Sequence, residues 1–444
     1  MSKNIKDAVS IIFTFKDEVF VIKRQNHLRS FPGYLAFVGG KVDKEDYDEA
    51  DHLLKEYAQY PIHLINALYR EVAEETSIKL HEIKKKNISY IGNALSPDFN
   101  PVRFNTYFFK VELDERIEFT LDEYEIEKGW WDRPESILKT WSEGEHLIVP
   151  PIRYYLRELA QDISSSNELN YIRKTHEEKI PLVESISDLI QYMPLSNTLP
   201  PADRTNAFYI RGDLKTLVDP SPKDEAELEK TLNTIDAIDQ ILITHYHRDH
   251  YQFTDEIAKR LNVKVLMTKD TYDLILKHRP HGYFDGIDIK FVKDLDKVTT
   301  WKGQEVKVYE VPGHAKGHIA LAPTSMNWFI AGDLFQGVGS VVVGGENASM
   351  QKYCESLQRV IDLDPKCVIP SHGIALGGVE IIKKNLSHRF KREKQILELF
   401  LKFQDLEEVY NKVYFGLDER LRPYAMANIE SHLEKLKIEG RVNY

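Results

Sequence analysis

Several apolar segments in the second half of the chain end in loops that carry histidine or aspartate. The heptapeptide THYHRDH, residues 244–250, follows the run IDAIDQILI and contains three histidines and one aspartate. Three later apolar segments end in the same way, in VPGHAKGH, FIAGDLF and CVIPSHG. Glycine or proline stands nearby in each, as in loops that carry functional side chains out of a rigid sheet. The pattern predicts short strands whose ends together build one polar site.

These side chains have the chemistry of a metal site. The chain has two cysteines, Cys354 and Cys367, so a metal must be held by imidazole nitrogen and carboxylate oxygen. His245 and His247 are two residues apart at a strand end and can face one metal, while residues 249–250 can face a second. Two metals need about six or seven ligands. The later segments supply the remaining candidates: His314, His318, Asp333 and His372.

The order of these motifs resembles that of the metallo-β-lactamase superfamily over roughly residues 183–380. The resemblance implies an αβ/βα sandwich that binds two zinc ions, or iron or manganese in their place. It implies three ligands on each metal and one bridging carboxylate: His245, His247 and His314; Asp249, His250 and His372; and Asp333 as the bridge. It also implies that Asp219, in TLVDP, orients a ligand histidine. His318 is expected to support the ligands or to bind substrate.

The implied reaction is hydrolysis, because two zinc ions lower the pKa of a shared water towards neutrality. Asp249 is expected to take part in catalysis. GHAKGH and SHRFKREKQIL resemble the branch that contains glyoxalase II-like thioesterases and β-lactamase-like endoribonucleases, in which a winged-helix-like tail covers one side of the site. Relatives have small glycines after the aspartate–histidine pair. This chain has Tyr251 and Gln252 there, which we expect to narrow the pocket or to stack on a substrate ring.

A second cluster of charge lies near the N-terminus, in ALYREVAEETSI, residues 67–78. On a helix, Glu71, Glu74 and Glu75 share one face, because residues three and four apart are neighbours. Like charges so placed repel one another, and a bound Mg²⁺ would reverse that penalty because it prefers oxygen ligands. From these residues alone, the segment is either a solvated acidic helix face or a magnesium site.

Together with FVGGKVDKED, residues 37–46, the segment REVAEETSI resembles the Nudix box. The resemblance covers roughly residues 5–160 and implies an α/β/α sandwich. It implies Mg²⁺ or Mn²⁺ held by Glu71, Glu74 and Glu75, with Glu75 also catalytic.

This chain departs from the Nudix pattern at several positions. Gly40 and Arg70 are separated by about twice the usual spacing, so an insertion around residues 48–64 is expected to loop out. Asp46 stands where the box carries its first glutamate. Ser77 replaces a glycine in an expected left-handed helix cap, at a cost of about 1 kcal/mol. Arg70 is expected to pair with the box carboxylates rather than with substrate.

The segment RQNHLRSFPGYLAFVGG resembles the additional signature of the coenzyme A diphosphatase branch of Nudix hydrolases. Arg24 and Arg29 fall at matching spacing, and both are expected to bind substrate because guanidinium matches phosphate oxygens. The alternative is a pair of ordinary surface arginines. DEYEIEKGWWDRPESIL resembles the end of the Nudix fold, and there Glu125 is expected to be a further metal ligand or a catalytic base.

Length and composition limit the organisation and partners of the chain. Its 444 residues are too many for one core, and we expect an α/β multidomain protein: a Nudix α/β/α sandwich at 1–165, a metallo-β-lactamase αβ/βα sandwich at 175–385 and a small helical domain at 386–444. The net charge of −11 argues against broad binding to nucleic acid or anionic membranes. No apolar run approaches the ~20 residues of a membrane span. The N-terminus lacks a secretory signal and cysteines are few, so a cytoplasmic location is expected.

These features together predict a metal-dependent hydrolase with two sites. In the favoured interpretation, the Nudix site cleaves a nucleoside-diphosphate-linked small molecule, coenzyme A or acyl-CoA, and the zinc site cleaves a thioester or related ester. In the alternative, the zinc site cuts single-stranded RNA while the Nudix domain processes or binds nucleotides. The basic segment KREK, residues 391–394, favours that alternative. No membrane partner is expected, and the oligomeric state is left open.

Overall fold

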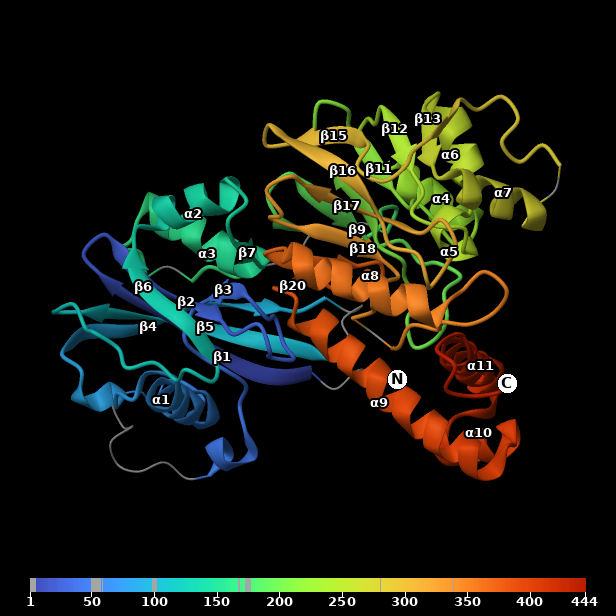
Figure 1. Cartoon of the computed structure of the whole chain (residues 1–444). Helices are drawn as coiled ribbons and strands as arrows, with labels where there is room; N and C mark the ends of the chain where they lie inside the picture. Colours follow the sequence, from blue (N-terminus) through green and yellow to red (C-terminus); the bar gives the residue numbers. More distant parts are fainter. Residues whose placement is uncertain are drawn as a thin grey trace. The chain divides into compact units, whose positions relative to one another are not determined.

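The computed structural model describes residues 5–48, 57, 59–97, 102–166, 168–171, 177–279, 281–337 and 339–444. These residues form two compact units that divide near residue 175, and residues 185–187 group with the first unit. Each unit is a layered α/β structure, so the expected multidomain α/β class is confirmed (Figure 1). The domain boundaries at 165–175 and 385–386 stay predictions. In the described part of the chain, every helix is too short or too polar to span a bilayer.

The first unit is built on one mixed sheet of seven strands. In pairing order these are β4 (Lys85–Leu95), β5 (Arg103–Leu113), β1 (Ile5–Phe15), β2 (Glu18–Arg24), β3 (Tyr34–Ala36) and β7 (Leu147–Ile148), with β6 (Ile126–Asp132) paired to β2. The helices are α1 (Ile62–Thr76), α2 (Pro134–Ser142) and α3 (Pro150–Gln161), with short 3-10 turns η1 (Lys44–Tyr47) and η3 (Leu80–Glu82).

The residues of β1 explain why helices cover both faces of this sheet. Val9, Ile11 and Phe13 belong to the core beneath α1, whereas Ile12 belongs to the core beneath α2 and α3. Successive side chains of a strand point to opposite faces, so both faces of β1 are apolar. Each face must therefore be covered, and the result is an α/β/α sandwich.

The observed ends of α1 agree with those predicted from the sequence. The helix begins directly after Pro61 and ends at Ser77, whose φ of 57° is the predicted left-handed cap. The expected insertion around residues 48–64 lies mostly outside the described residues, because 49–56 and 58 are not among them.

The second unit contains two sheets. The first pairs, in order, β14 (Ile289–Phe291), β13 (Lys264–Met267), β12 (Gln240–Leu242), β11 (Thr216–Val218), β10 (Ala207–Ile210), β9 (Leu189–Tyr192) and β8 (Leu182–Ile186). The second pairs, in order, β15 (Lys297–Trp301), β16 (Gln304–Glu310), β17 (Ile319–Pro323), β18 (Phe329–Gly332), β19 (Cys367–Pro370) and β20 (Leu376–Gly377). β11, β12 and β13 run parallel and are almost wholly buried, as expected for parallel strands covered on both faces.

Helices cover the outer face of each of these sheets. α4 (Glu225–Leu232), α6 (Thr254–Leu261) and α7 (Lys269–His278) share a core with the first sheet. α8 (Met350–Leu363) and α9 (Glu380–Phe403) share a core with the second. A single turn, α5 (Arg248–Tyr251), lies within the histidine-rich loop after β12. This is the αβ/βα sandwich expected from the sequence (Figure 1).

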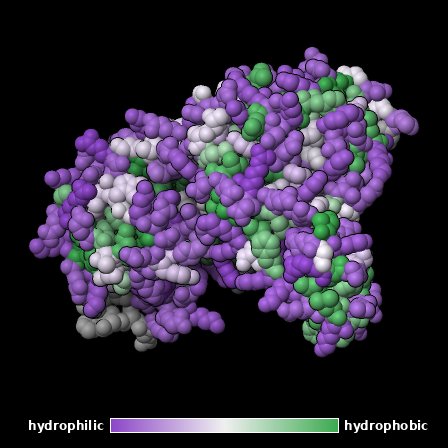
Figure 2. Space-filling view, in the orientation of Figure 1, coloured by the Kyte–Doolittle hydropathy of each residue, from purple (hydrophilic) through white to green (hydrophobic). Residues whose placement is uncertain are grey.

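The C-terminal helices have a small core of their own. α9 continues to Phe403 and is followed by α10 (Leu406–Val413), η4 (Glu419–Leu421) and α11 (Arg422–Ile438). Side chains of α9, α10 and α11 pack together there, so the expected boundary at 385–386 falls inside one continuous helix. Figure 2 shows apolar side chains gathered around α10, and Phe415, just after that helix, is exposed on 93% of its surface.

Phe109 provides a test of the division into two units. Its ring is fully buried on β5, which pairs with both β1 and β4. Phe109→Ala should lower the free energy of unfolding of the first unit by about 3–5 kcal/mol, because it leaves a cavity in that core. The second unit shares no core with Phe109 and should keep its stability. Denaturant unfolding of the whole chain, followed by hydrogen exchange of each unit, measures both.

Tyr124→Ala is the matched control for this experiment. Its ring is 68% exposed, so the same loss of an aromatic group should change stability by less than about 1 kcal/mol. An equal loss of stability in both units of Phe109→Ala would contradict the division.

Candidate metal centre

The candidate metal centre lies where strands of both sheets of the second unit end. His245 and His247 follow β12, and α5 begins directly after them. His314 lies between β16 and β17, Asp333 follows β18, and His372 follows β19. The structure thus brings together side chains from four segments that are far apart in the sequence.

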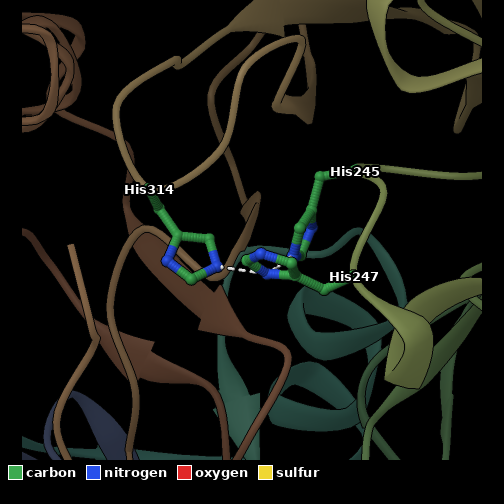
Figure 3. Close-up of side chains that lie close together, drawn as sticks. All are labelled: His245, His247 and His314. Atoms are coloured by element: carbon green, nitrogen blue, oxygen red, sulfur yellow. Dashed lines mark hydrogen bonds between the residues drawn. The ribbon is translucent and has the colours of Figure 1, made fainter. Parts of the chain in front are cut away.

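Three imidazoles converge with their nitrogen atoms facing one another. His247 Nδ1 lies 3.0 Å from His245 Nε2 and 2.8 Å from His314 Nε2 (Figure 3). All three ligand atoms lie within 4.8 Å of one another. Nitrogen atoms bound tetrahedrally at about 2.0–2.1 Å from zinc are about 3.3 Å apart, so this spacing suits one metal ion.

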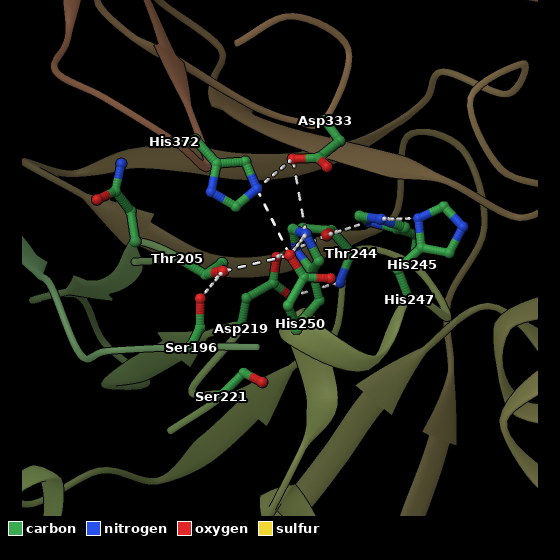
Figure 4. A network of polar contacts seen from close by, with 12 residues as sticks. Ser196, Thr205, Asp219, Ser221, Thr244, His245, His247, His250, Asp333 and His372 are labelled. Atoms are coloured by element: carbon green, nitrogen blue, oxygen red, sulfur yellow. Dashed lines mark hydrogen bonds and ion pairs between the residues drawn. The ribbon is translucent and has the colours of Figure 1, made fainter. Parts of the chain in front are cut away.

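A second set of ligand atoms adjoins the first. Two further groups have all their ligand atoms within 4.8 Å: His245, His250 and Asp333; and Asp249, His250 and His372. Asp333 Oδ1 lies 3.4 Å from His372 Nε2 and 3.6 Å from His250 Nε2 (Figure 4). Its other oxygen, Oδ2, lies 3.7 Å from His314 Nε2. The two oxygens therefore face different sets of histidines, as a bridging carboxylate would.

Backbone carbonyls fix which nitrogen the histidines offer to this centre. His314 Nδ1 lies 2.8 Å from the carbonyl oxygen of Val342, and His372 Nδ1 lies 2.8 Å from that of Arg204. A carbonyl oxygen only accepts, so Nδ1 carries the proton in both rings and Nε2 keeps a lone pair directed into the centre. Outer partners of this kind orient the ligands of metal sites.

Asp219 does the same for His250. Its Oδ2 accepts hydrogen bonds from His250 Nδ1 at 2.8 Å and from the Thr244 hydroxyl at 2.6 Å, and its Oδ1 accepts from the Thr244 N–H at 2.8 Å (Figure 4). The expected support of a histidine by Asp219 is confirmed. Thr244 Oγ1 also lies 3.1 Å from His245 Nδ1. Thr244 carries no motif of its own, and only its place before His245 marks it in the sequence.

Burial and neighbouring charges give the two halves of the centre different electrostatics. Burial lowers the pKa of His245 and His247 well below the usual value, and nearby imidazoles lower it further. Burial raises the pKa of Asp333, but two facing histidines outweigh it and hold the net pKa well below its usual range. Burial lowers the pKa of His250, yet the surrounding carboxylates, Asp333 first, raise it well above its usual value. One half therefore offers neutral lone pairs and the other offers negative charge.

Two of the atoms that face the centre are incompletely paired by the protein. His250 Nε2 and Asp333 Oδ1 are buried and make no well-formed hydrogen bond. Burying charged or polar atoms in this way is costly unless a partner is present. A divalent cation is such a partner, and a set of imidazole and carboxylate ligands suits zinc, iron or manganese. The residues therefore fit a centre with two metal ions.

His318 lies behind the other histidines. It is fully buried, and its ring centre is 4.8 Å from that of His245. A Cβ atom at Gly332 would lie 2.2 Å from His318 Nε2, so glycine is needed beside it. Its burial favours support of the ligands over the alternative role, and contact with substrate stays a prediction.

The two side chains that stand in place of small glycines face inward. Tyr251 is buried, and its hydroxyl accepts a hydrogen bond from Arg279 Nε at 3.2 Å. The Arg279 guanidinium lies 5.0 Å from the centre of the Tyr251 ring. The expectation that this ring stacks on a substrate is therefore wrong, because protein already covers it. Gln252 is also buried.

In the first unit, Arg70 holds the acidic face of α1 together. Its Nη1 lies 2.8 Å from Glu71 Oε1 and 2.9 Å from Glu74 Oε2. Its Nη2 lies 2.8 Å from Oδ2 of Asp46, which is buried. The expected pairing of Arg70 with the box carboxylates is confirmed.

Two glycines before the helix make room for the buried carboxylates. The Gly39 N–H donates to Glu75 Oε2 at 2.8 Å. A Cβ atom on Gly40 would lie 2.4 Å from the carboxylate of Glu71, so a larger residue there would displace it. The glycine turn in FVGG therefore contacts the helix through Glu71 and Glu75.

Burial raises the pKa of Glu75 to about 8. The Gly39 N–H and the charge of Arg24 oppose this rise in pKa, whereas the charges of Glu71 and Glu125 add to it. Arg24 and Glu125, both singled out in the sequence, are therefore close enough to Glu75 to act on its charge.

The remaining Nudix candidates are less enclosed. The Glu74 side chain is 59% exposed, and Arg29 is exposed. Among the described residues, the groups whose ligand atoms lie within 4.8 Å of one another all belong to the second unit. A cation site at Glu71, Glu74 and Glu75 therefore stays a prediction.

Three family models match the chain. Residues 200–372 match the metallo-beta-lactamase superfamily, residues 4–150 match the NUDIX domain, and residues 406–444 match the beta-lactamase associated winged helix domain. Together these matches span most of both compact units.

Several proteins are similar to part of the chain. A beta-lactamase-like protein 2 homolog of Drosophila melanogaster is 27% identical over 281 residues, which are 59% of this chain and 90% of that protein. A hydroxyacylglutathione hydrolase of Bdellovibrio bacteriovorus is 30% identical over 131 residues, 29% of this chain and 46% of that protein. The crystal structure of a beta-lactamase domain protein from Burkholderia ambifaria has the same fold, with a TM-score of 0.50 and 21% identity over 58% of this chain and 88% of that one.

The raised pKa of Glu75 predicts that cation binding to the first unit releases a proton. With a pKa of about 8 the free carboxyl is mostly protonated at pH 7, and a bound Mg²⁺ favours the carboxylate. Mg²⁺ binding should release close to one proton per chain at pH 7 and almost none at about pH 10. Calorimetry in buffers of different ionisation enthalpy, on chain whose second unit is loaded with zinc, counts these protons.

Glu75→Gln is the control, because an amide does not titrate. It should abolish the proton release at pH 7. A release that persists in this variant, or that does not change with pH, would show that another group is responsible.

Proposed function

Because the chain contains a Nudix domain and a metallo-β-lactamase domain and is a metal-dependent hydrolase, we propose that it hydrolyses two kinds of bond at two separate metal sites. The domains would occupy residues 1–165 and 175–385, followed by a winged-helix-like tail at 386–444. The observation that carries the proposal is the convergence of histidine and carboxylate ligand atoms in the second unit. In the first unit, the buried carboxylates Glu71 and Glu75 on one face of α1 support it.

In the second unit, the ligands would be the side chains that converge there: His245, His247 and His314 for one metal, Asp249, His250 and His372 for the other, and Asp333 for both. When bound, divalent metal ions in this centre supply Lewis acidity and lower the pKa of water towards neutrality. Asp249 would take up a proton from the attacking water, and its 14% exposure, the largest among the acids of the centre, supports this role.

The bond cleaved in the second unit would be a thioester or a related ester. Hydroxyacylglutathione hydrolases are among the similar proteins, and they support an acyl group as the part that is transferred to water. His318 would contribute to the substrate side only if the loop around it moves, because it is buried.

In the first unit, Glu71, Glu74 and Glu75 would hold Mg²⁺ or Mn²⁺ and position a diphosphate for hydrolysis, with Glu125 as a further ligand or base. Arg24 and Arg29 would bind phosphate oxygens, and coenzyme A or acyl-CoA is the favoured substrate. The influence of Arg24 and Glu125 on the pKa of Glu75 supports their place at this site.

A second candidate function is cleavage of single-stranded RNA in the second unit, with the Nudix domain processing or binding nucleotides. A groove of about 580 Å³ runs along α8 and α9 and is bordered by Lys383, Lys391, Lys394 and Phe390. The Phe390 ring is 49% exposed. Lysines attract phosphates, and an exposed aromatic ring can stack on a base. The net charge of −11 weighs against this candidate.

Substitutions in the two sites should separate the two activities. Asp333→Ala should lose metal and nearly all ester hydrolysis, because two cations would then face each other without a bridging charge, and should leave diphosphate hydrolysis intact. Glu74→Gln and Glu75→Gln should each lower diphosphate hydrolysis by about 100-fold or more and spare ester hydrolysis, because an amide cannot replace the charge that holds Mg²⁺. The assays are steady-state rates on coenzyme A esters, dinucleotides and short RNAs, with metal content by mass spectrometry.

Two results would contradict this assignment. Folded wild-type protein purified without chelator should contain close to two metals per chain in the second unit, and the absence of zinc, iron and manganese would remove the basis of the proposal. Unchanged diphosphate hydrolysis in Glu75→Gln would show that these carboxylates form an ordinary helix surface.

Arg29 tests the substrate class of the first unit. If it binds a phosphate of coenzyme A, Arg29→Ala should raise KM by about tenfold to 150-fold and change kcat less, since one charge-assisted contact contributes roughly 1.5–3 kcal/mol. The loss should be larger for coenzyme A than for a diphosphate that lacks the 3′-phosphoadenosine group.

Arg133→Ala, at an exposed arginine of the same unit, is the control and should leave KM unchanged for both substrates. An equal loss for both substrates in Arg29→Ala would indicate a general diphosphatase. If the wild-type protein cleaves RNA but does not hydrolyse coenzyme A or its esters, the second candidate function, RNA cleavage, is favoured.

A further inference from the structure

Gln252 connects three segments beside the metal centre. It is buried and lies at the end of α5, two residues after His250. Its Oε1 accepts hydrogen bonds from Asn197 Nδ2 at 2.8 Å and from Arg248 Nε at 3.0 Å. Its Nε2 donates to the carbonyl oxygen of Lys223 at 2.8 Å. Both polar atoms of the side chain are thus used to hold other parts of the chain.

Asn197 lies in a short hairpin, residues 195–204, one residue beyond its stem. The stem is closed by a β-bridge between Leu195 and Arg204 and by a hydrogen bond of 3.0 Å from the Ser196 N–H to the carbonyl oxygen of Asp203. Beside the stem, Asn197 Nδ2 donates to Gln252 Oε1 at 2.8 Å and to the carbonyl oxygen of Lys223 at 2.9 Å. The stem and the Asn197 side chain therefore hold the hairpin at its base.

This hairpin supports the second set of ligands. The carbonyl oxygen of Arg204 accepts the hydrogen bond from His372 Nδ1, and Thr198 Oγ1 lies 3.4 Å from His372 Nε2. Thr205, directly after the hairpin, places its hydroxyl 3.4 Å from Asp249 Oδ2 and 2.7 Å from the hydroxyl of Ser196 (Figure 4). His372 and Asp249 thus depend on this segment for their orientation.

The first set of ligands takes its support from elsewhere. His314 is oriented by the carbonyl oxygen of Val342, and His245 contacts Thr244. Neither residue belongs to the hairpin. A change in the hairpin should therefore act on one metal and spare the other.

We propose that the contact between Asn197 and Gln252 is a latch that fixes the 195–204 hairpin and so sets the affinity of the centre for the metal at Asp249, His250 and His372. Both are positioning residues, because they act through the hairpin and touch neither metal nor substrate. The inference rests on the proposed centre with two metals.

The test measures metal affinity directly rather than turnover. The full-length, zinc-loaded protein is titrated with a chelator, and the release of each metal is followed. Asn197→Ala and Gln252→Ala should each lower the affinity for one of the two metals by about tenfold, as the loss of an outer partner does. The affinity for the other metal should stay unchanged. Because both substitutions remove the contact between Asn197 and Gln252, the effect of the double variant should be smaller than the sum of the two single effects. Asn197 is exposed, so its variant folds even if the Gln252 variant does not.

Two further variants make the result specific. Gln252→Glu keeps an oxygen that accepts from Asn197 and Arg248 but loses the donation to the Lys223 carbonyl, so it should retain more of the affinity than Gln252→Ala. Gln240 is a buried glutamine of the same unit, bonded to Thr216 Oγ1 at 2.9 Å and to the carbonyl oxygen of Val298 at 2.8 Å. Gln240→Ala should lower stability without a selective loss of one metal.

Wild-type affinity in both alanine variants, equal weakening of both metals, or additive effects in the double variant would overturn the latch. A wild-type protein that binds fewer than two metals in this unit would instead overturn the proposed centre itself. The two failures are therefore distinguishable.

Discussion

The buried carboxylate of Asp333 is the constraint on which the second unit depends. A charge so enclosed must be compensated, and its compensation comes from histidines that follow β12, β16 and β19, in both sheets. The two sheets must therefore pack in one register for the charge to be tolerated. A metal ion would complete this balance.

The first unit solves the problem of buried carboxylates differently. Arg70 and the Gly39 N–H neutralise the acidic face of α1, and burial raises the pKa of Glu75 towards the protonated state. The second unit presents lone pairs that outer partners have already oriented. The first unit must lose a proton before Glu75 can bind a cation.

Outer partners link the metal centre to distant parts of the second unit. Asp219 joins β11 to the histidine loop, and the hairpin at residues 195–204 joins β9 and β10 to His372. Gln252 joins this network through its hydrogen bond with Asn197 in the hairpin. Contacts of this kind orient the side chains that would hold each metal.

The sequence by itself determined the two α/β domains and the residues that converge in the second unit. Strand and helix periodicity depends on neighbouring residues, and the candidate ligands from His245 to His250 lie within six consecutive residues. The left-handed cap at Ser77 and the pairing of Arg70 also followed from local pattern. Tertiary structure decided the rest. Tyr251 is buried, and Thr205 and the Arg204 carbonyl contact Asp249 and His372. Long-range packing sets these burials and distances, and no local sequence pattern encodes them.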